Sequence, residues 1–135
     1  MIRHFIKDIK YLVLPTQNDI LTIAEKDYLP LNIQRFFIVK SKKNTKRGHH
    51  AHRQLTQYLI CVHGLCDVIC DDGKIRRTFH LTHTNQALLI PPGIWAEQIY
   101  HKKDTTLLVA CDAEYDEADY IRDYDEFLIF RKMNP

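Results

Sequence analysis

Three histidines stand close together in the stretch RGHHAH, which covers residues 47–52. In an extended strand alternate side chains face the same side, so His50 and His52 project together and His49 points the other way. Imidazole titrates near neutral pH, and it is also a common metal ligand. The pair therefore predicts either a metal site or a site of proton transfer.

The spacing around this pair resembles the first motif of the cupin family, in which H-x-H is followed by Glu and then by Gly. Here His50 and His52 are followed, after four residues, by Gln57 and, after six more, by Gly64. The second cupin motif, P-x-G-x-x-H, ends here on Ala96. Neutral Gln is a poor ligand for a transition metal and Ala is none. We therefore expect a cupin without metal or other cofactor, with a metal-dependent cupin oxygenase as an alternative.

The elements that must position the pair are short strands. Segments rich in β-branched and aromatic residues are separated by turn signals such as HG, DDG and PPG, and Asp72-Gly73 predicts a hairpin. This pattern predicts an all-β sandwich or barrel, and the helical spacing of the last aromatic residues predicts a short C-terminal helix over about 116–131. The resemblance to the cupins implies that the all-β fold is a cupin-type jelly-roll barrel. The predicted strands are residues 20–25, 35–40, 57–62, 66–71, 75–81, 87–90 and 105–111.

Length and charge limit the possible functions. The 135 residues fit a single domain, 1–135, and the net charge of +2 is too small to indicate a nucleic-acid partner. No apolar run could span a bilayer, the N-terminus does not resemble a signal peptide, and the four cysteines form no C-x-x-C pair. We expect a soluble, cytoplasmic protein that binds no membrane. The basic run 40–47 is either a solvated loop or a rim that steers an anionic ligand.

Four segments resemble the nucleotide-sugar 3,4-ketoisomerases, the metal-free cupins that act on dTDP-4-keto-6-deoxyglucose. Within this family Gln57 is the usual residue, which agrees with a site without metal. The match extends from about residue 20 to residue 127. The segments are LPLNIQRFFI (29–38), RGHHAHRQLTQYLICVHG (47–64), PPGIWAEQ (91–98) and YDEADYIRDYDEF (115–127).

The resemblance implies an isomerase that moves a ketone from C4 to C3 of the hexose through an enediol. Histidine suits such proton transfers. We expect His52 to be the base and His50 its partner, with little to separate the two. Arg47 or Arg35 would bind the pyrophosphate bidentately, unless each is an ordinary surface arginine.

Three more residues are expected to bind substrate. Trp95 would wall the sugar pocket, with plain core packing as the alternative, and Glu97 would hydrogen-bond an imidazole. Gln57 completes the set. The family has histidine where this chain has Ala96, and this difference keeps open a non-catalytic module that binds nucleotide sugars. A 3,5-epimerase-like cupin is the other alternative; it would need a carboxylate paired with the base, and none is evident from spacing.

The resemblance also implies a biological setting. The 3-keto product would serve an aminotransferase that makes a 3-amino sugar for a surface glycan such as an O-antigen, S-layer or lipooligosaccharide. Family members form homodimers in which N-terminal strands cross to the neighbour, and the apolar N-terminal segment is compatible with that.

Overall fold

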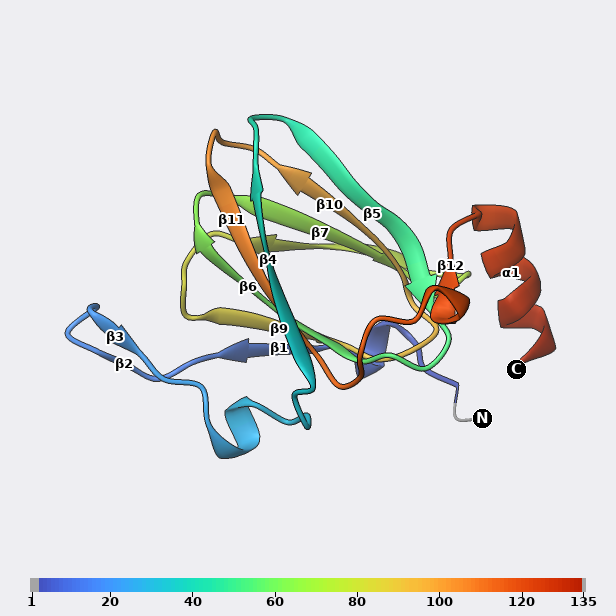
Figure 1. Ribbon diagram of the computed structural model, residues 1–135, viewed down its shortest axis with the longest axis horizontal. Coiled ribbons are helices and arrows are strands. Elements are labelled where there is room, and N and C mark those ends of the chain that lie inside the picture. Colours follow the sequence, from blue (N-terminus) through green and yellow to red (C-terminus); the bar gives the residue numbers. More distant parts are fainter. Residues whose placement is uncertain (1–2, 135) are drawn as a thin grey trace.

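The β-branched and aromatic segments pair into two antiparallel sheets, which face each other in the computed structural model of the chain (Figure 1). The structure describes residues 3–134. The first sheet has the order β1 (Lys10–Val13), β9 (Gln86–Ile90), β6 (Gln57–His63), β11 (Thr105–Cys111), β4 (Arg35–Ser41). The second has the order β12 (Tyr120–Ile121), β5 (Thr45–His52), β10 (Trp95–Tyr100), β7 (Cys66–Asp71), β8 (Arg76–Leu81).

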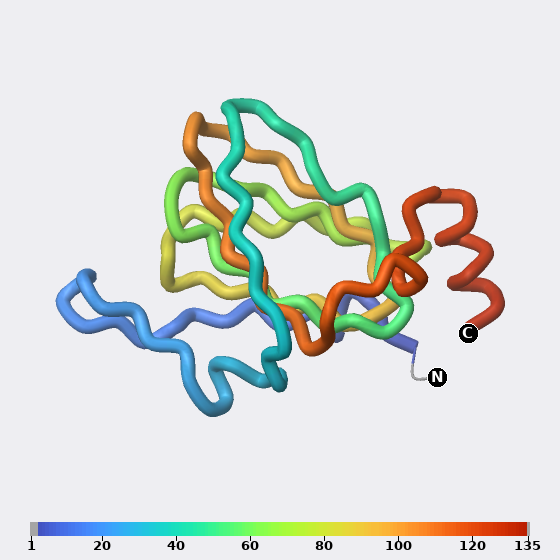
Figure 2. The backbone as a smooth tube through the Cα atoms, in the orientation of Figure 1, coloured from blue at the N-terminus to red at the C-terminus, as the bar shows by residue number. Residues whose placement is uncertain are grey.

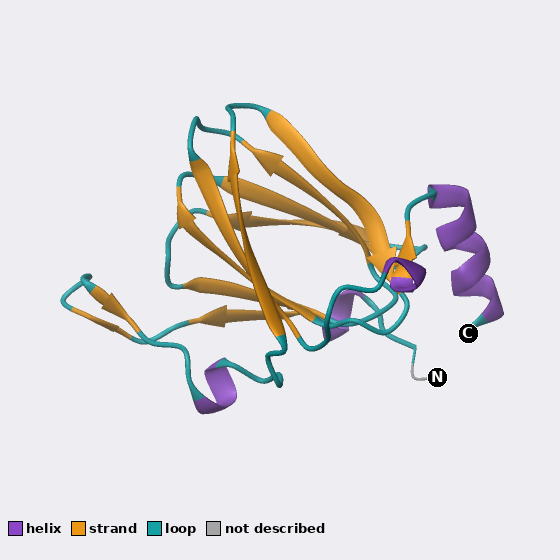
Figure 3. Ribbon diagram, in the orientation of Figure 1, coloured by secondary structure: helices purple, strands orange, loops and turns teal. Residues whose placement is uncertain are grey.

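This arrangement confirms the predicted all-β jelly roll with a short C-terminal helix. Strands dominate the chain in Figure 3. Over residues 3–134 the two sheets face each other without closing into one hydrogen-bonded barrel. The inward side chains of both sheets form one large apolar cluster, with Leu59, Val68, Leu81 and Leu107 fully buried.

The hairpin predicted at Asp72-Gly73 joins β7 to β8. The Asp72 carboxylate accepts hydrogen bonds from the backbone N–H groups of Lys74 (2.9 Å) and Ile75 (2.8 Å). Gly73 has a φ of +93°, a left-handed conformation that glycine adopts without steric cost. Local turn chemistry alone was therefore enough to predict this connection.

The C-terminal helix begins later than predicted. Helix α1 covers Tyr124–Met133, and the predicted residues before it form a 3-10 turn, η3 (Glu117–Asp119), and strand β12. Asp123 starts the helix, because its side chain accepts a hydrogen bond from the Glu126 N–H at 3.0 Å. Tyr120 and Ile121 have helical spacing with the later aromatics, but they pair with His52 and Ala51 of β5. Tertiary pairing overrides the periodicity here.

A hairpin in the N-terminal region extends away from the sheets. After η1 (Ile6–Asp8) and β1, the hairpin of β2 (Thr16–Gln17) and β3 (Leu21–Thr22) projects from the body of the molecule, and η2 (Lys26–Tyr28) returns the chain to β4 (Figures 1 and 2). The strand predicted over 20–25 is thus reduced to two residues. Within residues 3–134, no helix has the length and apolar character that crossing a bilayer requires.

Candidate active site

Strand β5 brings His50 and His52 together, with ring centroids 5.0 Å apart. A bulge interrupts its pairing with β10, since Ala96 lies opposite His50 while Glu97 lies opposite Gly48. His49 is the unpaired residue of this bulge; its φ is +55° and its side chain is half exposed. The bulge therefore turns His49 outward and leaves the other two imidazoles on one face.

His52 is held by a carboxylate distant in sequence. Its Nδ1 lies 3.0 Å from Oδ2 of Asp119, and its ring is almost fully buried. Asp119 is itself fixed, because it accepts hydrogen bonds from the backbone N–H groups of Gln54 (2.7 Å) and Leu55 (3.3 Å). When Nδ1 donates to Asp119, the lone pair of neutral imidazole lies on Nε2, which has no hydrogen-bond partner within residues 3–134. This nitrogen is placed to accept a proton.

Both imidazoles favour the neutral form. Burial, together with the neighbouring His52, lowers the pKa of His50 to about 4. Burial also lowers the pKa of His52, and the contact with Asp119 opposes part of that effect. At neutral pH either ring can therefore act as a base, and His52 is the one whose tautomer is set by a carboxylate.

The segment that contains Asp119 forms a wall beside the two rings. The Tyr120 ring lies 5.1 Å from that of His50 and 4.4 Å from that of His52, measured between centroids. The Arg122 guanidinium stands 4.1 Å from the centroid of Tyr120 and binds the Glu117 carboxylate through Nε (2.7 Å) and Nη2 (2.9 Å). This bidentate pair lowers the pKa of Glu117 to about 2.

Two pockets open beside the histidines, and Arg35 and Tyr120 line both of them. The basic pocket, of about 350 Å³, contains three arginines and no carboxylate. The acidic pocket, of about 200 Å³, contains His52 and four carboxylates. The polar lining of the basic pocket is Arg35, Arg47, His50, Gln57, Gln98, Tyr120 and Arg122. The acidic side chains of the other pocket are Asp112, Glu114, Asp116 and Asp119.

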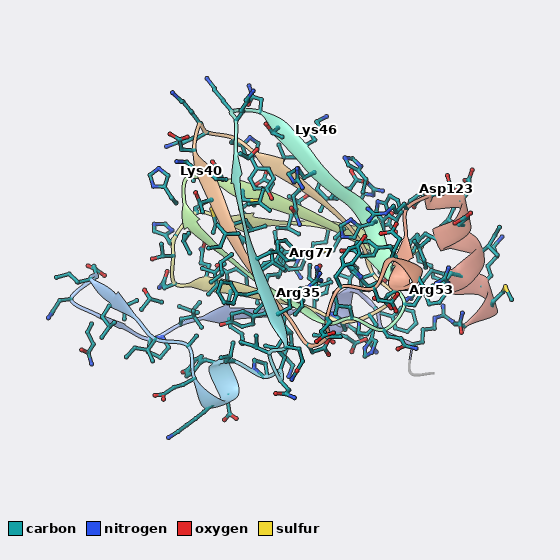
Figure 4. All side chains as sticks on the ribbon, viewed as in Figure 1. Arg35, Lys40, Lys46, Arg53, Arg77 and Asp123 are labelled. Atoms are coloured by element: carbon teal, nitrogen blue, oxygen red, sulfur yellow. The ribbon has the colours of Figure 1, made fainter. Side chains whose placement is uncertain are left out.

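The predicted arginines and Gln57 lie at these pockets. Arg35 starts β4, at the opposite end of that strand from Lys40 (Figure 4). Gln57 is 7% exposed and, with Ala96, lines a small cavity of about 10 Å³ against both imidazoles.

The structure places Trp95 and Glu97 outside these pockets, in agreement with the core-packing alternative for Trp95. Strand alternation puts Ala96 on the inner face of β10 and turns its two neighbours outward. Trp95 packs against Tyr124 and Phe127 of α1, with ring centroids 5.3 and 5.7 Å away, and its Nε1 donates to Glu97 Oε2 at 2.8 Å. The imidazole nearest to Glu97 is His49, 3.7 Å away in the bulge.

Sequence reasoning missed Asp119, Tyr120 and Arg122. The segment YDEADYIRDYD was noticed for its resemblance, but its helical periodicity hid the strand that pairs it with β5. The carboxylate that spacing does not reveal is Asp119, which meets His52 across 67 residues of sequence.

A metal does not fit the donors at this site. Two imidazoles face an amide, Gln57, and a methyl group, Ala96, where a transition metal would need further charged or imidazole ligands. Residues 3–134 contain no group of three or more His, Cys, Asp or Glu side chains that could hold a metal ion.

Known proteins are similar to this chain in sequence and in fold. Residues 5–132 match the protein family described as FdtA: WxcM-like, C-terminal. Over 116 residues the chain is 35% identical to the TDP-4-oxo-6-deoxy-alpha-D-glucose-3,4-oxoisomerase of Aneurinibacillus thermoaerophilus. The aligned residues cover 85% of this chain and 84% of the relative.

Two solved structures extend the likeness to three dimensions. The TDP-quinovose 3,4-ketoisomerase WlaRB of Campylobacter jejuni has a TM-score of 0.84 and 36% identity, covering 92% of this chain and 99% of that one. A histidine-to-asparagine mutant of the 3,4-ketoisomerase QdtA of Thermoanaerobacterium thermosaccharolyticum, in complex with TDP-4-keto-6-deoxyglucose, has a TM-score of 0.87 and 28% identity, covering 96% and 97%. The predicted family is therefore confirmed: the chain belongs to the FdtA family of nucleotide-sugar 3,4-ketoisomerases.

Proposed function

We propose that this protein converts dTDP-4-keto-6-deoxyglucose to a dTDP-3-keto-6-deoxyhexose. The observation that carries the proposal is the buried His52, held by Asp119 through Nδ1 with its Nε2 free, beside a second neutral imidazole. The family membership and the substrate named for the QdtA complex support the same reaction.

The basic pocket suits the diphosphate of the substrate. Arg35 and Arg47 make no ion pair within residues 3–134, whereas Arg122 is already held by Glu117. Guanidinium groups bind phosphate oxygens bidentately. With the diphosphate there, the hexose reaches the side chains that line the deeper cavity, namely His50, His52 and Gln57.

Proton transfer can then proceed without a redox partner. The ketone at C4 makes the proton on C3 acidic, and Nε2 of His52 removes it to give an enediolate with its charge on O4. The O3 proton passes to O4, and the imidazolium formed on His52 returns a proton to C4, which leaves the ketone at C3. We assign to His50 and Gln57 the hydrogen bonds that stabilise the charged oxygen.

Incubation with dTDP-4-keto-6-deoxyglucose in D2O tests the reaction. We expect deuterium at C4 of a 3-keto product and, from reversal, at C3 of recovered substrate. His52→Asn should abolish both, and His49→Asn, a matched control on the outer face, should retain them. If concentrated enzyme yields neither deuterium nor 3-keto sugar but still binds dTDP, the chain is a binding module and the proposal fails.

A second candidate is a 3,5-epimerase-like reaction on the same sugar. The His52–Asp119 pair favours it, because a carboxylate-held base is what that reaction requires. The same D2O experiment separates the two reactions, since epimerisation places deuterium at C5 and leaves the ketone at C4.

We further propose a cytoplasmic homodimer that supplies an aminotransferase in the synthesis of a 3-amino sugar for a surface glycan. The projecting β2–β3 hairpin supports the dimer, because Ile20 and Leu21 at its tip are 89% and 49% exposed (Figure 1). Sedimentation equilibrium of the full chain should give twice the mass of one chain, and Ile20→Asp with Leu21→Asp should shift it toward monomer.

A further inference from the structure

A separate cationic pocket lies between α1, the β7–β8 loop and the N-terminal segment. Its volume is about 280 Å³. Four cationic side chains and one carboxylate line it, which leaves a net charge of +3 when all are ionised. These residues are Arg3, Lys74, Arg131, Lys132 and Asp72, and we call the site the α1 pocket.

Arg131 is the unusual member of the α1 pocket. It is only 7% exposed, and its one hydrogen bond runs from Nη1 to the carbonyl oxygen of Gly93 at 2.9 Å. Its Nε and Nη2 are buried and have no hydrogen-bond partner within residues 3–134, and the same holds for Nε of Arg3. A buried donor without a partner costs about 1–3 kcal/mol, and more when the group is charged.

The nearby carboxylate does not supply the missing partner. Both oxygens of Asp72 accept backbone hydrogen bonds, Oδ1 from the loop and Oδ2 from the Ile6 N–H at 3.1 Å. No Arg131–Asp72 ion pair forms within 4.0 Å. Burial accordingly lowers the pKa of Arg131, while the charge of Asp72 opposes that effect without cancelling it.

Two glycines lie against the Arg131 side chain. A Cβ atom at Gly73 would stand 3.3 Å from Cγ of Arg131, and one at Gly93 would stand 3.3 Å from its Nη1. Both glycines also have positive φ, of +93° and +80°. Two turns of the chain thus pass close to the Arg131 side chain, whose charge no described side chain neutralises directly.

We propose that the α1 pocket binds a small phosphate-class oxyanion, and that the guanidinium groups of Arg131 and Arg3, whose buried Nε and Nη2 donors have no partner within residues 3–134, turn toward its oxygens when it binds. The planar guanidinium offers paired donors that match the spacing of phosphate oxygens. Lys74 and Lys132 at the rim contribute charge without a fixed geometry. Inorganic phosphate and a phosphate monoester share this chemistry, and the site is separate from the diphosphate pocket at His50.

The bound oxyanion would be linked to the active site through two hydrogen bonds. Arg131 donates to the carbonyl oxygen of Gly93, and the N–H of Gly93 donates to the carbonyl oxygen of His52 at 2.7 Å. An oxyanion that holds Arg131 in place therefore also restrains the turn at Gly93, to which His52 at the end of β5 is hydrogen-bonded.

Binding can be measured at the arginines themselves. We would follow the Nε–H signals of Arg131 and Arg3 by NMR of ¹⁵N-labelled full chain, adding inorganic phosphate at ionic strength held constant with chloride. We expect saturable shifts of both signals, with a dissociation constant in the millimolar range or below. Glycerol 1-phosphate and succinate in parallel titrations distinguish a monoester and a planar dicarboxylate from free phosphate.

Exposed lysines provide variants that should fold. Lys74→Gln with Lys132→Gln should weaken phosphate binding at least tenfold, and the matched control Lys102→Gln with Lys103→Gln, in the β10–β11 turn, should leave it within twofold. Shifts that chloride alone reproduces, tighter binding of succinate than of either phosphate, or equal affinity in the two double variants would each overturn the proposal.

Discussion

Two carboxylates of this protein each hold imidazole, and they do so in different surroundings. Asp119 and His52 lie 3.0 Å apart with side chains 13% and 6% exposed. Asp67 lies 2.6 Å from His80 and 2.8 Å from His101, whose side chains are 67% and 41% exposed. The distances between carboxylate and imidazole are similar at the two sites, which we call the buried pair and the surface cluster. The sites differ in how much of each side chain is exposed.

The pKa that shifts belongs to the imidazole at the buried pair and to the carboxylate at the surface cluster. At the buried pair, desolvation lowers the pKa of His52 and outweighs the carboxylate, so the imidazole remains a neutral base. At the surface cluster, His80 and His101 lower the pKa of Asp67, although partial burial opposes them. A carboxylate–imidazole contact therefore predicts a general base only where water is excluded.

The largest expected effect comes from removing the base. His52→Asn should lower turnover and deuterium exchange at least about 10³-fold, because general base catalysis contributes in that range. The affinity for dTDP should stay within twofold, since the base contacts the sugar. His80→Asn, which removes a histidine from the surface cluster, should leave both unchanged in the same assays. Near-normal exchange in His52→Asn would refute the assignment.

Loss of the orienting carboxylate should have a smaller effect. We expect Asp119→Asn to lower kcat by about 10²-fold, because the amide no longer fixes the tautomer that presents Nε2. Steady-state kinetics should show KM nearly unchanged, while circular dichroism checks the fold. Asp67→Asn is the matched control and should retain full kcat. Equal kcat in the two variants would mean that the buried pair is merely structural.

The buried pair should also set the pH dependence. Since the pKa of His52 is lowered, we expect kcat/KM to hold its neutral value below pH 6.5 and to fall only when His52 binds a proton. Initial rates between pH 4.5 and 8 measure this. A profile that already falls at pH 7 would show that His52 is not desolvated.

The pH dependence of the free energy of unfolding should reflect the protonation of His50. The unfolded chain binds a proton at about pH 6.5, whereas the folded ring has a pKa of about 4. Stability is therefore greatest above pH 6.5 and is lost as the pH falls toward 4, by about 1 kcal/mol at pH 5 after allowance for partial solvent contact. Urea unfolding of wild type and His50→Gln at pH 7 and 5 should show a smaller loss in the variant; equal losses would contradict this.

The surface cluster should give the smallest change. The lowered pKa of Asp67 means that its contribution to stability exists above its unfolded pKa and is lost as the pH falls through the folded value. We expect Asp67→Asn to lower the free energy of unfolding by less than about 1 kcal/mol at pH 5.5, and by almost nothing in 0.5 M salt. If Asp67→Asn lowered the free energy of unfolding by more than about 1 kcal/mol regardless of salt, the surface cluster would behave like the buried pair, and the comparison would fail.

Much of the fold and part of the site were predictable from local patterns. The strands, the β7–β8 hairpin and the shared orientation of His50 and His52 depend on side-chain alternation and turn residues, which act over a few positions. The family resemblance added Arg35, Arg47 and Gln57, all of which lie at the pockets. Motif matching could not show that strand alternation turns Trp95 and Glu97 away from the pockets.

The sequence by itself determined the strands and the two imidazoles on one strand face, because those features need only neighbouring residues, and its family motifs implied the jelly roll. Tertiary structure alone decided that Asp119 meets His52. That contact needs β12 to pair with β5, although the spacing of the residues around β12 is typical of a helix. Tertiary structure also decided that Arg131 lies buried without a direct counter-ion, because burial and missing partners arise only when α1 packs against turns far away in the chain.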